Sequence, residues 1–159
     1  MDSLMKYINR IHRCAGQYRS VRIPKAELAQ HQHIYIFHIC RQPGISQEQL
    51  AKRVCVTKSN VTRQLNSLER QGYVKRIPDK EDRRVLQVYP TCQAEELYPD
   101  ILRVMREWNA LLFAELSAEE KNQLIQMLER IMNRAVRAVE GKDGLVADQI
   151  VYHSGEEQV

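Results

Sequence analysis

One stretch of the sequence, residues 57–72, combines a helical apolar stripe with a face of hydrogen-bonding side chains. At about 100° per residue, the spacing of an α-helix, Val61, Leu65 and Leu68 fall together on one side. The opposite pole and its flanks carry short groups that donate and accept hydrogen bonds, and one guanidinium: Ser59, Asn60, Thr62, Arg63, Asn66 and Ser67. Arg and Asn can bond guanine and adenine edges bidentately, and Ser and Thr reach bases or phosphates. This chemistry is suited to reading DNA; a solvated helix surface is the alternative.

The residues around this stretch predict a helix–turn–helix. Ser46 and Gln49 form a capping box that opens a short helix, and Thr57 can cap the next one. Gly72 suits the position just after the second helix. Lys58 lies beside the free N–H groups of that helix start, where we expect it to bind a phosphate. In such a motif the second helix enters the major groove, and this context favours DNA reading over a solvated surface.

A β-hairpin is predicted directly after the second helix. Residues 73–77 and 84–89 are rich in strand-forming side chains and flank a charged loop that contains proline. The tip carries cations that could reach an adjacent minor groove, where arginine is favoured: Lys80, Arg83 and Arg84. Asp82 lies among them, and we expect it to fix an arginine by a charge-assisted hydrogen bond. A soluble turn is the alternative, but attachment to a helix–turn–helix favours a wing.

Helices are predicted on both sides of this unit. Apolar residues at helical spacing predict a first helix over about residues 2–20, and a second follows from about Lys25 to Cys40. A long amphipathic helix starts near Thr91, and Ser117 opens a last helix with a capping box. The expected fold class is mainly α: a winged helix–turn–helix with a short β-hairpin wing, flanked by N- and C-terminal dimerisation helices.

The predicted organisation has four segments within one structural domain. They are N-terminal helices for dimerisation and support (1–45), the DNA-binding region (46–91), C-terminal dimerisation helices (92–140) and a flexible tail (141–159). The first two segments each carry a net charge of +5, whereas residues 92–159 carry −6. A polyanion would therefore be attracted to only part of the molecule.

Composition narrows the class of protein. The 159 residues are 43% hydrophobic and 28% charged, as in an ordinary soluble domain. No apolar run approaches the ~18–20 residues of a membrane span, and the N-terminus lacks a signal-peptide core, so we expect a cytoplasmic protein. The four cysteines form no C-x-x-C pair, which predicts reduced, mostly buried thiols. No phosphate loop, nucleophile elbow or H-E-x-x-H motif is present, so neither an enzyme nor a cofactor is expected.

Residues 46–91 resemble the winged helix–turn–helix of MarR-type bacterial transcriptional regulators, and the similarity extends outward to about residues 4–139. The matching positions are Leu50, Ala51, Lys58, Ser59, Val61, Thr62, Arg63, Leu68, Glu69, Gly72, Val74, Arg76, Asp82 and Arg84. The resemblance implies a homodimer whose terminal helices interlock. It also implies two recognition helices in successive major grooves of a pseudo-palindromic operator on double-stranded DNA.

The resemblance further implies a repressor that releases DNA when a small, often aromatic or phenolic, effector binds. Helix position suggests Tyr18, Tyr35, His38 and Trp108 as pocket residues, with core or interface packing as the alternative. Some relatives instead sense oxidants through a cysteine, for which Cys14 and Cys55 are the candidates. The histidines are not accompanied by acidic or cysteine ligands at zinc-like spacing, so no metal site is expected. A DNA-binding architectural protein without sequence preference is the remaining alternative.

Overall fold

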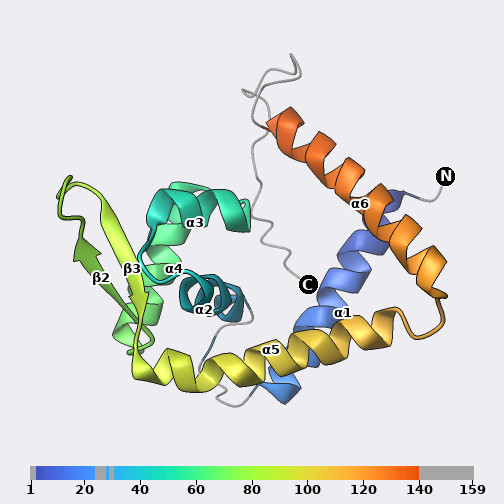
Figure 1. Cartoon of the computed structure of the whole chain (residues 1–159), viewed down its shortest axis with the longest axis horizontal. Coiled ribbons are helices and arrows are strands. Elements are labelled where there is room, and N and C mark those ends of the chain that lie inside the picture. The colour runs from blue at the N-terminus through green and yellow to red at the C-terminus, as the bar shows by residue number, and fades with distance from the viewer. Residues whose placement is uncertain (1–2, 24–27, 29–30, 140–159) are drawn as a thin grey trace, which may run out of the picture. The chain divides into compact units, whose positions relative to one another are not determined.

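The computed structural model describes residues 3–23, Leu28 and residues 31–139, which divide between two compact units, 1–111 and 112–159. The first unit contains α1 (Leu4–Arg22), α2 (Gln32–Arg41), β1 (Ile45–Ser46), α3 (Gln47–Val54), α4 (Lys58–Arg70), β2 (Val74–Pro78), β3 (Leu86–Pro90) and nearly all of α5 (Cys92–Leu112). The second contains α6 (Ala118–Val139). Figure 1 shows this mainly helical fold with its small sheet, which confirms the predicted fold class.

The core of the first unit is built around the apolar stripe of α4. Val61, Leu65 and Leu68 are all 0% exposed, as the helical periodicity predicts. They belong to one cluster with buried side chains from α2, α3, the turn after α4, the sheet and α5: Tyr35, Ile36, Ile39, Ile45, Leu50, Ala51, Tyr73, Val74, Val88, Ala94, Leu97 and Ile101. Burial of each large aliphatic side chain contributes about 1.5–3 kcal/mol. The stripe therefore anchors α4 and leaves its polar face outward.

The ends of α3 and α4 follow their local signals. Ser46 and Gln49 complete the predicted capping box, and the Thr57 hydroxyl accepts a hydrogen bond from the Asn60 amide at 3.3 Å. After α4, the Tyr73 amide donates to the Leu68 carbonyl, and Gly72, with φ of 80°, donates to the Glu69 carbonyl. This pair of bonds is a Schellman motif, in which glycine adopts the left-handed conformation without a Cβ clash.

The sheet is three-stranded and antiparallel, in the order β1-β3-β2. Val74 pairs with Pro90 and Pro78 with Leu86, so both wing strands lie one or two residues from their predicted positions. The sequence prediction contained only the hairpin and omitted β1, in which Ile45 pairs with Val88. A two-residue strand has no measurable alternation, and its pairing partner lies more than forty residues away, so no local pattern could reveal it.

The start of α2 differs from the prediction. We expected a helix from about Lys25, but α2 begins at Gln32, and Leu28 and His31 lie outside it. Good helix formers such as Ala, Glu and Leu favoured the earlier start, and propensity is a weak guide that tertiary context overrides. Residues 24–27 and 29–30, together with the predicted tail at 141–159, lie outside the described residues.

The turn between α3 and α4 holds a non-glycine residue in a left-handed conformation. Cys55 has φ of 56° and ψ of 50°, and it is exposed. This conformation costs an L-residue about 1–2 kcal/mol, whereas glycine adopts it freely but loses more entropy on folding. We expect Cys55→Gly to raise the free energy of unfolding by up to about 1 kcal/mol. Urea unfolding should give Cys55→Gly a higher free energy of unfolding than the matched control Cys55→Ala, which keeps the Cβ. The reverse order would show that the left-handed conformation does not strain residue 55.

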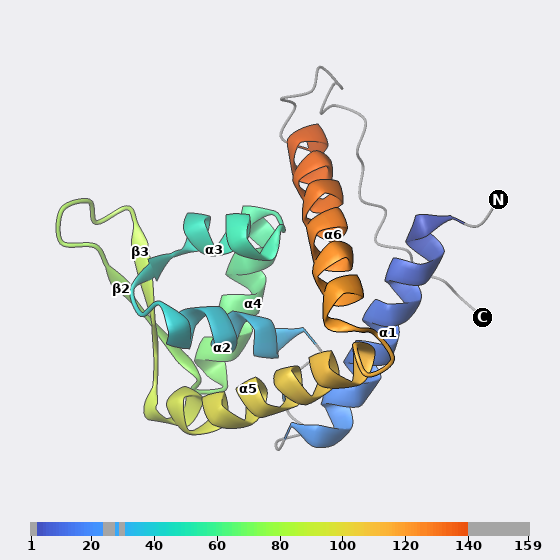
Figure 2. The same cartoon turned by 45° about the vertical axis from the view of Figure 1, so that its right-hand side comes forward.

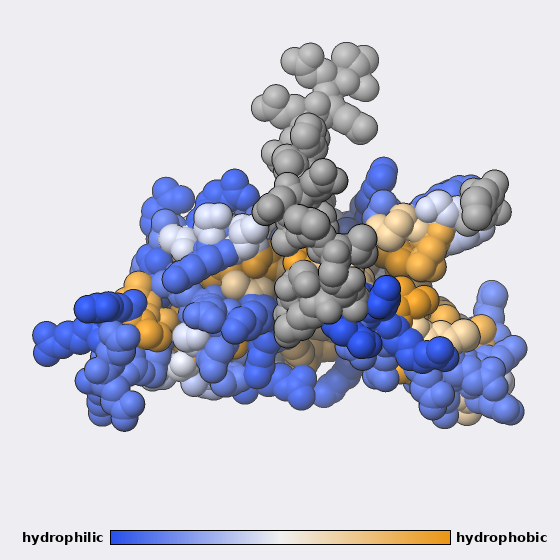
Figure 3. Space-filling model, turned by 90° about the horizontal axis from the view of Figure 1, so that it is seen from above, coloured by the Kyte–Doolittle hydropathy of each residue, from blue (hydrophilic) through white to orange (hydrophobic). Residues whose placement is uncertain are grey.

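Apolar side chains remain exposed on the two terminal helices of the described chain. Those of α1 are Leu4, Met5, Tyr7, Ile8, Ile11 and Val21, and those of α6 are Met127, Leu128, Ile131, Met132 and Val139. None of the residues of α6 is buried. Figure 3 shows hydrophobic patches lying open among hydrophilic side chains. Exposed apolar helix faces of this kind are typical of protein–protein contacts. None of the described helices combines the length and the apolar composition needed to cross a lipid bilayer.

Candidate nucleic-acid interface

The polar side chains of α4 lie on the face opposite its buried stripe, at two levels of exposure. Lys58, Ser59, Arg63 and Asn66 are exposed, whereas Asn60 and Thr62 are half-buried. The structure thus presents the six predicted side chains on one helix. The exposed ones include the only arginine of the predicted base-reading set, and an exposed guanidinium can approach a guanine edge without rearrangement of the domain.

The two half-buried side chains have partners on other elements. The Thr62 hydroxyl lies 3.2 Å from Gln47 Oε1 of α3 and 3.0 Å from the Lys58 carbonyl. The Tyr35 hydroxyl of α2 donates to Asn60 Oδ1 at 3.3 Å. The domain therefore holds both edges of the polar face in place, one through α2 and the other through α3.

The wing projects from the helix–turn–helix as a thin hairpin, which both views show (Figures 1 and 2). The predicted cations Lys80, Arg83 and Arg84 are exposed in the loop between its strands. The loop is organised by Asp79, whose Oδ1 accepts from the Glu81 amide at 2.8 Å and from the Asp82 amide at 3.2 Å. These bonds, the Glu81 amide first, lower the pKa of the Asp79 carboxyl.

Asp79 was not among the residues predicted from the sequence, although Pro78-Asp79 at the start of a loop is a signal for an aspartate turn. Its second carboxylate oxygen accepts from the Gln87 amide group of β3. Asp79 therefore joins both strands of the wing to the turn between them.

Asp82 has a different contact from the expected one. Its Oδ1 accepts a hydrogen bond from the Arg84 backbone amide at 3.0 Å, and its carbonyl accepts from the Val85 amide at 2.9 Å. We expected a bond to an arginine side chain. A short aspartate side chain in a tight turn reaches the backbone N–H two residues ahead more readily than a long, mobile guanidinium. Asp82 shapes the turn that carries the arginines.

An ion pair joins α4 to the wing. Arg76 of β2 donates to Glu69 of α4 through its guanidinium, with Nε 3.1 Å from Oε2, and through its backbone amide, 3.2 Å from Oε1. The Arg76 side chain is 17% exposed and that of Glu69 is 38% exposed. The pair had no role in the sequence-based prediction. The feature of the sequence that could have predicted the pair is the presence of two opposite charges on either side of the Gly72 turn.

This pair makes stability depend on pH in a defined direction. The Arg76 side-chain hydrogen bond, followed by their charge attraction, lowers the pKa of Glu69 in the folded state. An unfolded glutamate titrates near about 4.3, so the stabilisation is complete above that pH and is lost as pH falls through the lower folded pKa. We expect Glu69→Gln to cost about 1 kcal/mol near neutral pH, because solvent screens a partly exposed pair.

Urea unfolding of wild type and Glu69→Gln from about pH 7 down to about pH 3 measures this effect. The difference between the two proteins should shrink as pH falls. Glu48→Gln is the control, since it removes a more exposed pair with Lys52 and should change the stability less than Glu69→Gln does. A difference that stays constant with pH would contradict the assignment to ionised Glu69.

The structure brings together two of the four predicted pocket residues. The rings of Tyr18 in α1 and Trp108 in α5 have centroids 5.1 Å apart and planes at 43°. These helices cross each other in both views (Figures 1 and 2). The Arg22 guanidinium lies over the Tyr18 ring, with its carbon 3.8 Å from the centroid. This cluster offers aromatic faces and one cation.

The other two predicted pocket residues have different surroundings. Tyr35 is only 2% exposed and bonds Asn60 of α4. His38 is half-buried, with its ring 5.1 Å from that of Phe37 and nearly perpendicular to it. Burial, and then the charges of Arg53 and Arg41, lower the pKa of His38.

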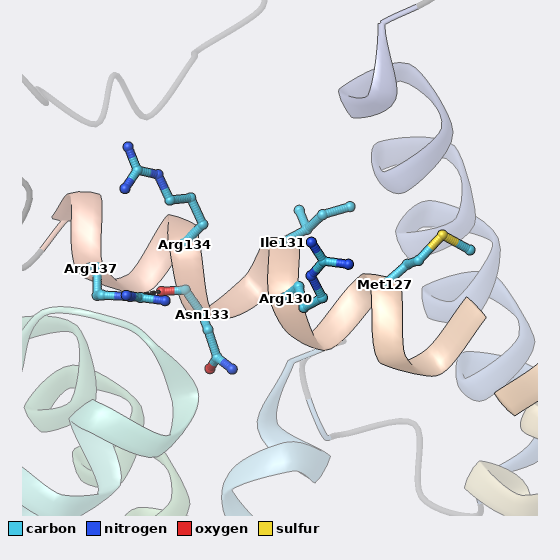
Figure 4. Close-up of a pocket in the computed structure, with 6 residues that line it drawn as sticks. All are labelled: Met127, Arg130, Ile131, Asn133, Arg134 and Arg137. Carbon is cyan, nitrogen blue, oxygen red and sulfur yellow. Dashed lines mark hydrogen bonds between the residues drawn. The ribbon is translucent and has the colours of Figure 1, made fainter. Parts of the chain in front are cut away.

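A pocket lies on α6 in the second unit (Figure 4). The described residues that line it all belong to α6: Met127, Arg130, Ile131, Asn133, Arg134 and Arg137. Arg137 Nε donates to the Asn133 carbonyl at 3.3 Å. None of the predicted effector residues contributes to its lining.

The cysteines are more accessible than expected. Cys14, Cys55 and Cys92 are exposed, so the expectation of mostly buried thiols is wrong. Only Cys40 is half-buried, and burial, followed by the charge of Glu95, raises its pKa to about 11. Cys14 lies on an outer position of α1, and Cys55 lies in an irregular turn, where residues need not follow burial periodicity. Within the described ranges, no three His, Cys, Asp or Glu side chains gather as metal ligands.

These features define a class of protein. A short helix, a turn and a second helix with an outward polar face, followed by a hairpin with a cationic loop, form a winged helix–turn–helix, a DNA-binding fold. A model of the MarR family matches residues 28–86, from before α2 to the start of β3.

Comparisons with a related sequence and with a solved structure agree with this family match. The chain is 25% identical over 137 residues to the uncharacterized HTH-type transcriptional regulator YybA of Bacillus subtilis (strain 168), covering 86% of this chain and 91% of that one. It is similar to the crystal structure of MarR, with 31% identity, a TM-score of 0.73, and coverage of 89% and 98%. The protein belongs to the MarR family of DNA-binding transcriptional regulators, which is not a family of enzymes.

The fold also matches that of a MarR family transcriptional regulator from Listeria monocytogenes, whose crystal structure is a complex with a 26mer DNA. The TM-score is 0.82 at 24% identity, over 91% of this chain and 96% of that one. At this identity the likeness concerns the fold.

Proposed function

We propose that this protein is a homodimeric, sequence-specific regulator that represses transcription until a small aromatic or phenolic effector releases it from its operator. The observation that carries the proposal is the outward face of α4, where exposed Arg63 and Asn66 lie opposite a fully buried stripe. The regulator would act in the cytoplasm, where its DNA lies.

Each DNA contact in the proposal has a chemical basis. Arg63 and Asn66 reach base edges in the major groove, with Ser59, Asn60 and Thr62 beside them, and Lys58 binds a phosphate at the helix start. Lys80, Arg83 and Arg84 follow the adjacent minor groove from the loop that Asp82 shapes. The DNA complex of the Listeria relative supports this use of the fold.

Dimerisation is supported by the uncovered helices. The apolar side chains on α1 and α6 would be covered by a second copy, which supports the assignment of dimer-forming helices to the segments 1–45 and 92–140. Two copies related by a twofold axis would present two recognition helices to half-sites about one helical turn apart.

The effector proposal rests on the Tyr18–Trp108 pair. Two tilted rings beside the Arg22 guanidinium offer stacking surfaces and a cation, which together suit a planar phenol or aromatic acid. Tyr35 and His38 have other contacts, so the proposal gives the main role to Tyr18 and Trp108.

A redox-sensing regulator of the same fold is the second candidate. The observation that favours it is the exposure of Cys14 and Cys55, because an oxidant must reach the sulfur. In this case an oxidant, rather than a phenolic compound, would lower the affinity for DNA.

A footprint on the DNA flanking the protein's own gene tests these proposals. At fixed salt, a specific regulator should prefer that DNA to random sequence by about 10³-fold or more, whereas a non-specific architectural protein would show mainly a salt dependence. Repeating the footprint with a phenolic panel and with an oxidant separates the two release mechanisms. Analytical ultracentrifugation should show a dimer, and a monomer that still protects two half-sites would contradict the proposed assembly.

A further inference from the structure

A buried tyrosine of α2 contacts the base-reading face of α4. Tyr35 is 2% exposed, and its hydroxyl donates to Asn60 Oδ1 at 3.3 Å. The backbone of Asn60 is held as well, since its amide donates to the Thr57 cap at 3.3 Å. Asn60 therefore has both its main chain and its side chain fixed by the domain.

The contact determines which end of the amide faces outward. The carbonyl oxygen and the amino group of an asparagine side chain point in diverging directions from the same carbon, so an oxygen held toward the core leaves the amino group on the outer side. In this contact the Tyr35 hydroxyl is the donor and the Asn60 oxygen is the acceptor. Burial raises the pKa of Tyr35, and Arg63 only partly opposes this, so the hydroxyl keeps the proton that it donates. Asn60 is half-buried, which keeps its outer edge accessible.

We propose that Tyr35 is a positioning residue for DNA recognition, which makes Asn60 present its amino group as a donor to a base acceptor. The inference rests on the proposed role of α4 in reading base edges. A bidentate contact with adenine needs both amide atoms, one to accept from N6 and one to donate to N7. An oxygen already held by Tyr35 disfavours that arrangement. Asn60 then selects acceptors on the major-groove edge, such as O6 or N7 of guanine or O4 of thymine.

The experiment is selection of binding sites from a randomised DNA library by the full-length protein, which works without a known operator sequence. Wild type should select a motif with guanine or thymine, rather than adenine, at one position in each half-site. Tyr35→Phe removes only the hydroxyl, and we expect the preference at that position to fall about three- to tenfold. The rest of the motif should be unchanged.

Epistasis separates positioning from a general structural effect. Asn60→Ala should lose the same preference, and adding Tyr35→Phe to Asn60→Ala should change nothing further. Tyr73→Phe is the matched control, because Tyr73 is 1% exposed in the same core but follows the far end of α4. It should select the wild-type motif.

Several outcomes would overturn the inference. A Tyr35→Phe motif identical to that of wild type, or a further change when Tyr35→Phe is added to Asn60→Ala, would rule out positioning. A wild-type protein that selects no motif would instead refute the proposed sequence-specific function, and the inference with it. If Tyr35→Phe does not fold, as judged by circular dichroism, the site selection is repeated with Asn60→Asp. It keeps an acceptor for Tyr35 but has no amino group, so a retained preference would overturn the proposal.

Discussion

Arg63→Ala is expected to weaken binding to the operator by about 1–3 kcal/mol, or roughly 5- to 150-fold in Kd, while leaving the fold intact. The Arg63 side chain is exposed on the outer face of α4, so its removal creates no cavity. The loss should be much smaller on random DNA, because a base-edge contact contributes only where the correct base is present. Fluorescence anisotropy with the selected site and with a scrambled site, at one salt concentration, measures both affinities.

The wing provides the control for this prediction. Arg84 is exposed in the loop of the hairpin, where a cation contributes through backbone charge and groove potential. Arg84→Ala should weaken binding to both DNAs by a similar factor and reduce the salt slope by about one. If Arg63→Ala and Arg84→Ala both bound the two DNAs as wild type does, the assigned roles would be wrong.

Leu65→Ala is expected to lower the free energy of unfolding by about 2–5 kcal/mol. Leu65 is 0% exposed at the centre of the stripe that attaches α4 to the core, so truncation removes apolar contacts and leaves a cavity. A single domain is stable by only about 5–15 kcal/mol, so this is a large fraction of the total. Urea unfolding monitored by circular dichroism measures the change.

The neighbouring residue gives a matched control for Leu65→Ala. Asn66 is exposed on the polar face, and Asn66→Ala should change stability by no more than about 0.5 kcal/mol while affecting DNA binding. Equal destabilisation by the two substitutions would show that α4 is not held by its apolar stripe.

Local signals in the sequence were sufficient to predict the helix–turn–helix. The capping box at Ser46, the cap at Thr57 and the glycine at residue 72 each act within one helical turn, and the structure confirms all three. The periodicity of Val61, Leu65 and Leu68 likewise predicted which face is buried. These features depend on neighbours along the chain, which a single sequence displays.

Features that depend on distant partners were missed or assigned incorrectly. β1 exists because Ile45 meets Val88, and the first turn of α4 is restrained because Tyr35 reaches Asn60, twenty-five positions along the chain. For Asp82 in the wing, the sequence predicted the wrong hydrogen-bond partner. Charge composition suggested that Asp82 binds a guanidinium, whereas turn geometry gives its carboxylate to a backbone amide. The sequence identified the residue but not its partner.

The Glu69–Arg76 pair and the tight turn at Gly72 attach the end of α4 to the first strand of the wing, so we expect the helix and the hairpin to move together. A displacement of the helix should then also displace the hairpin, because the ion pair joins the two directly. An effector that tilts the helix out of the major groove would also withdraw the hairpin from the minor groove. Release should therefore be concerted, with both parts of the footprint disappearing at one effector concentration. Glu69→Gln would uncouple them, so that the two protections fade at separate concentrations.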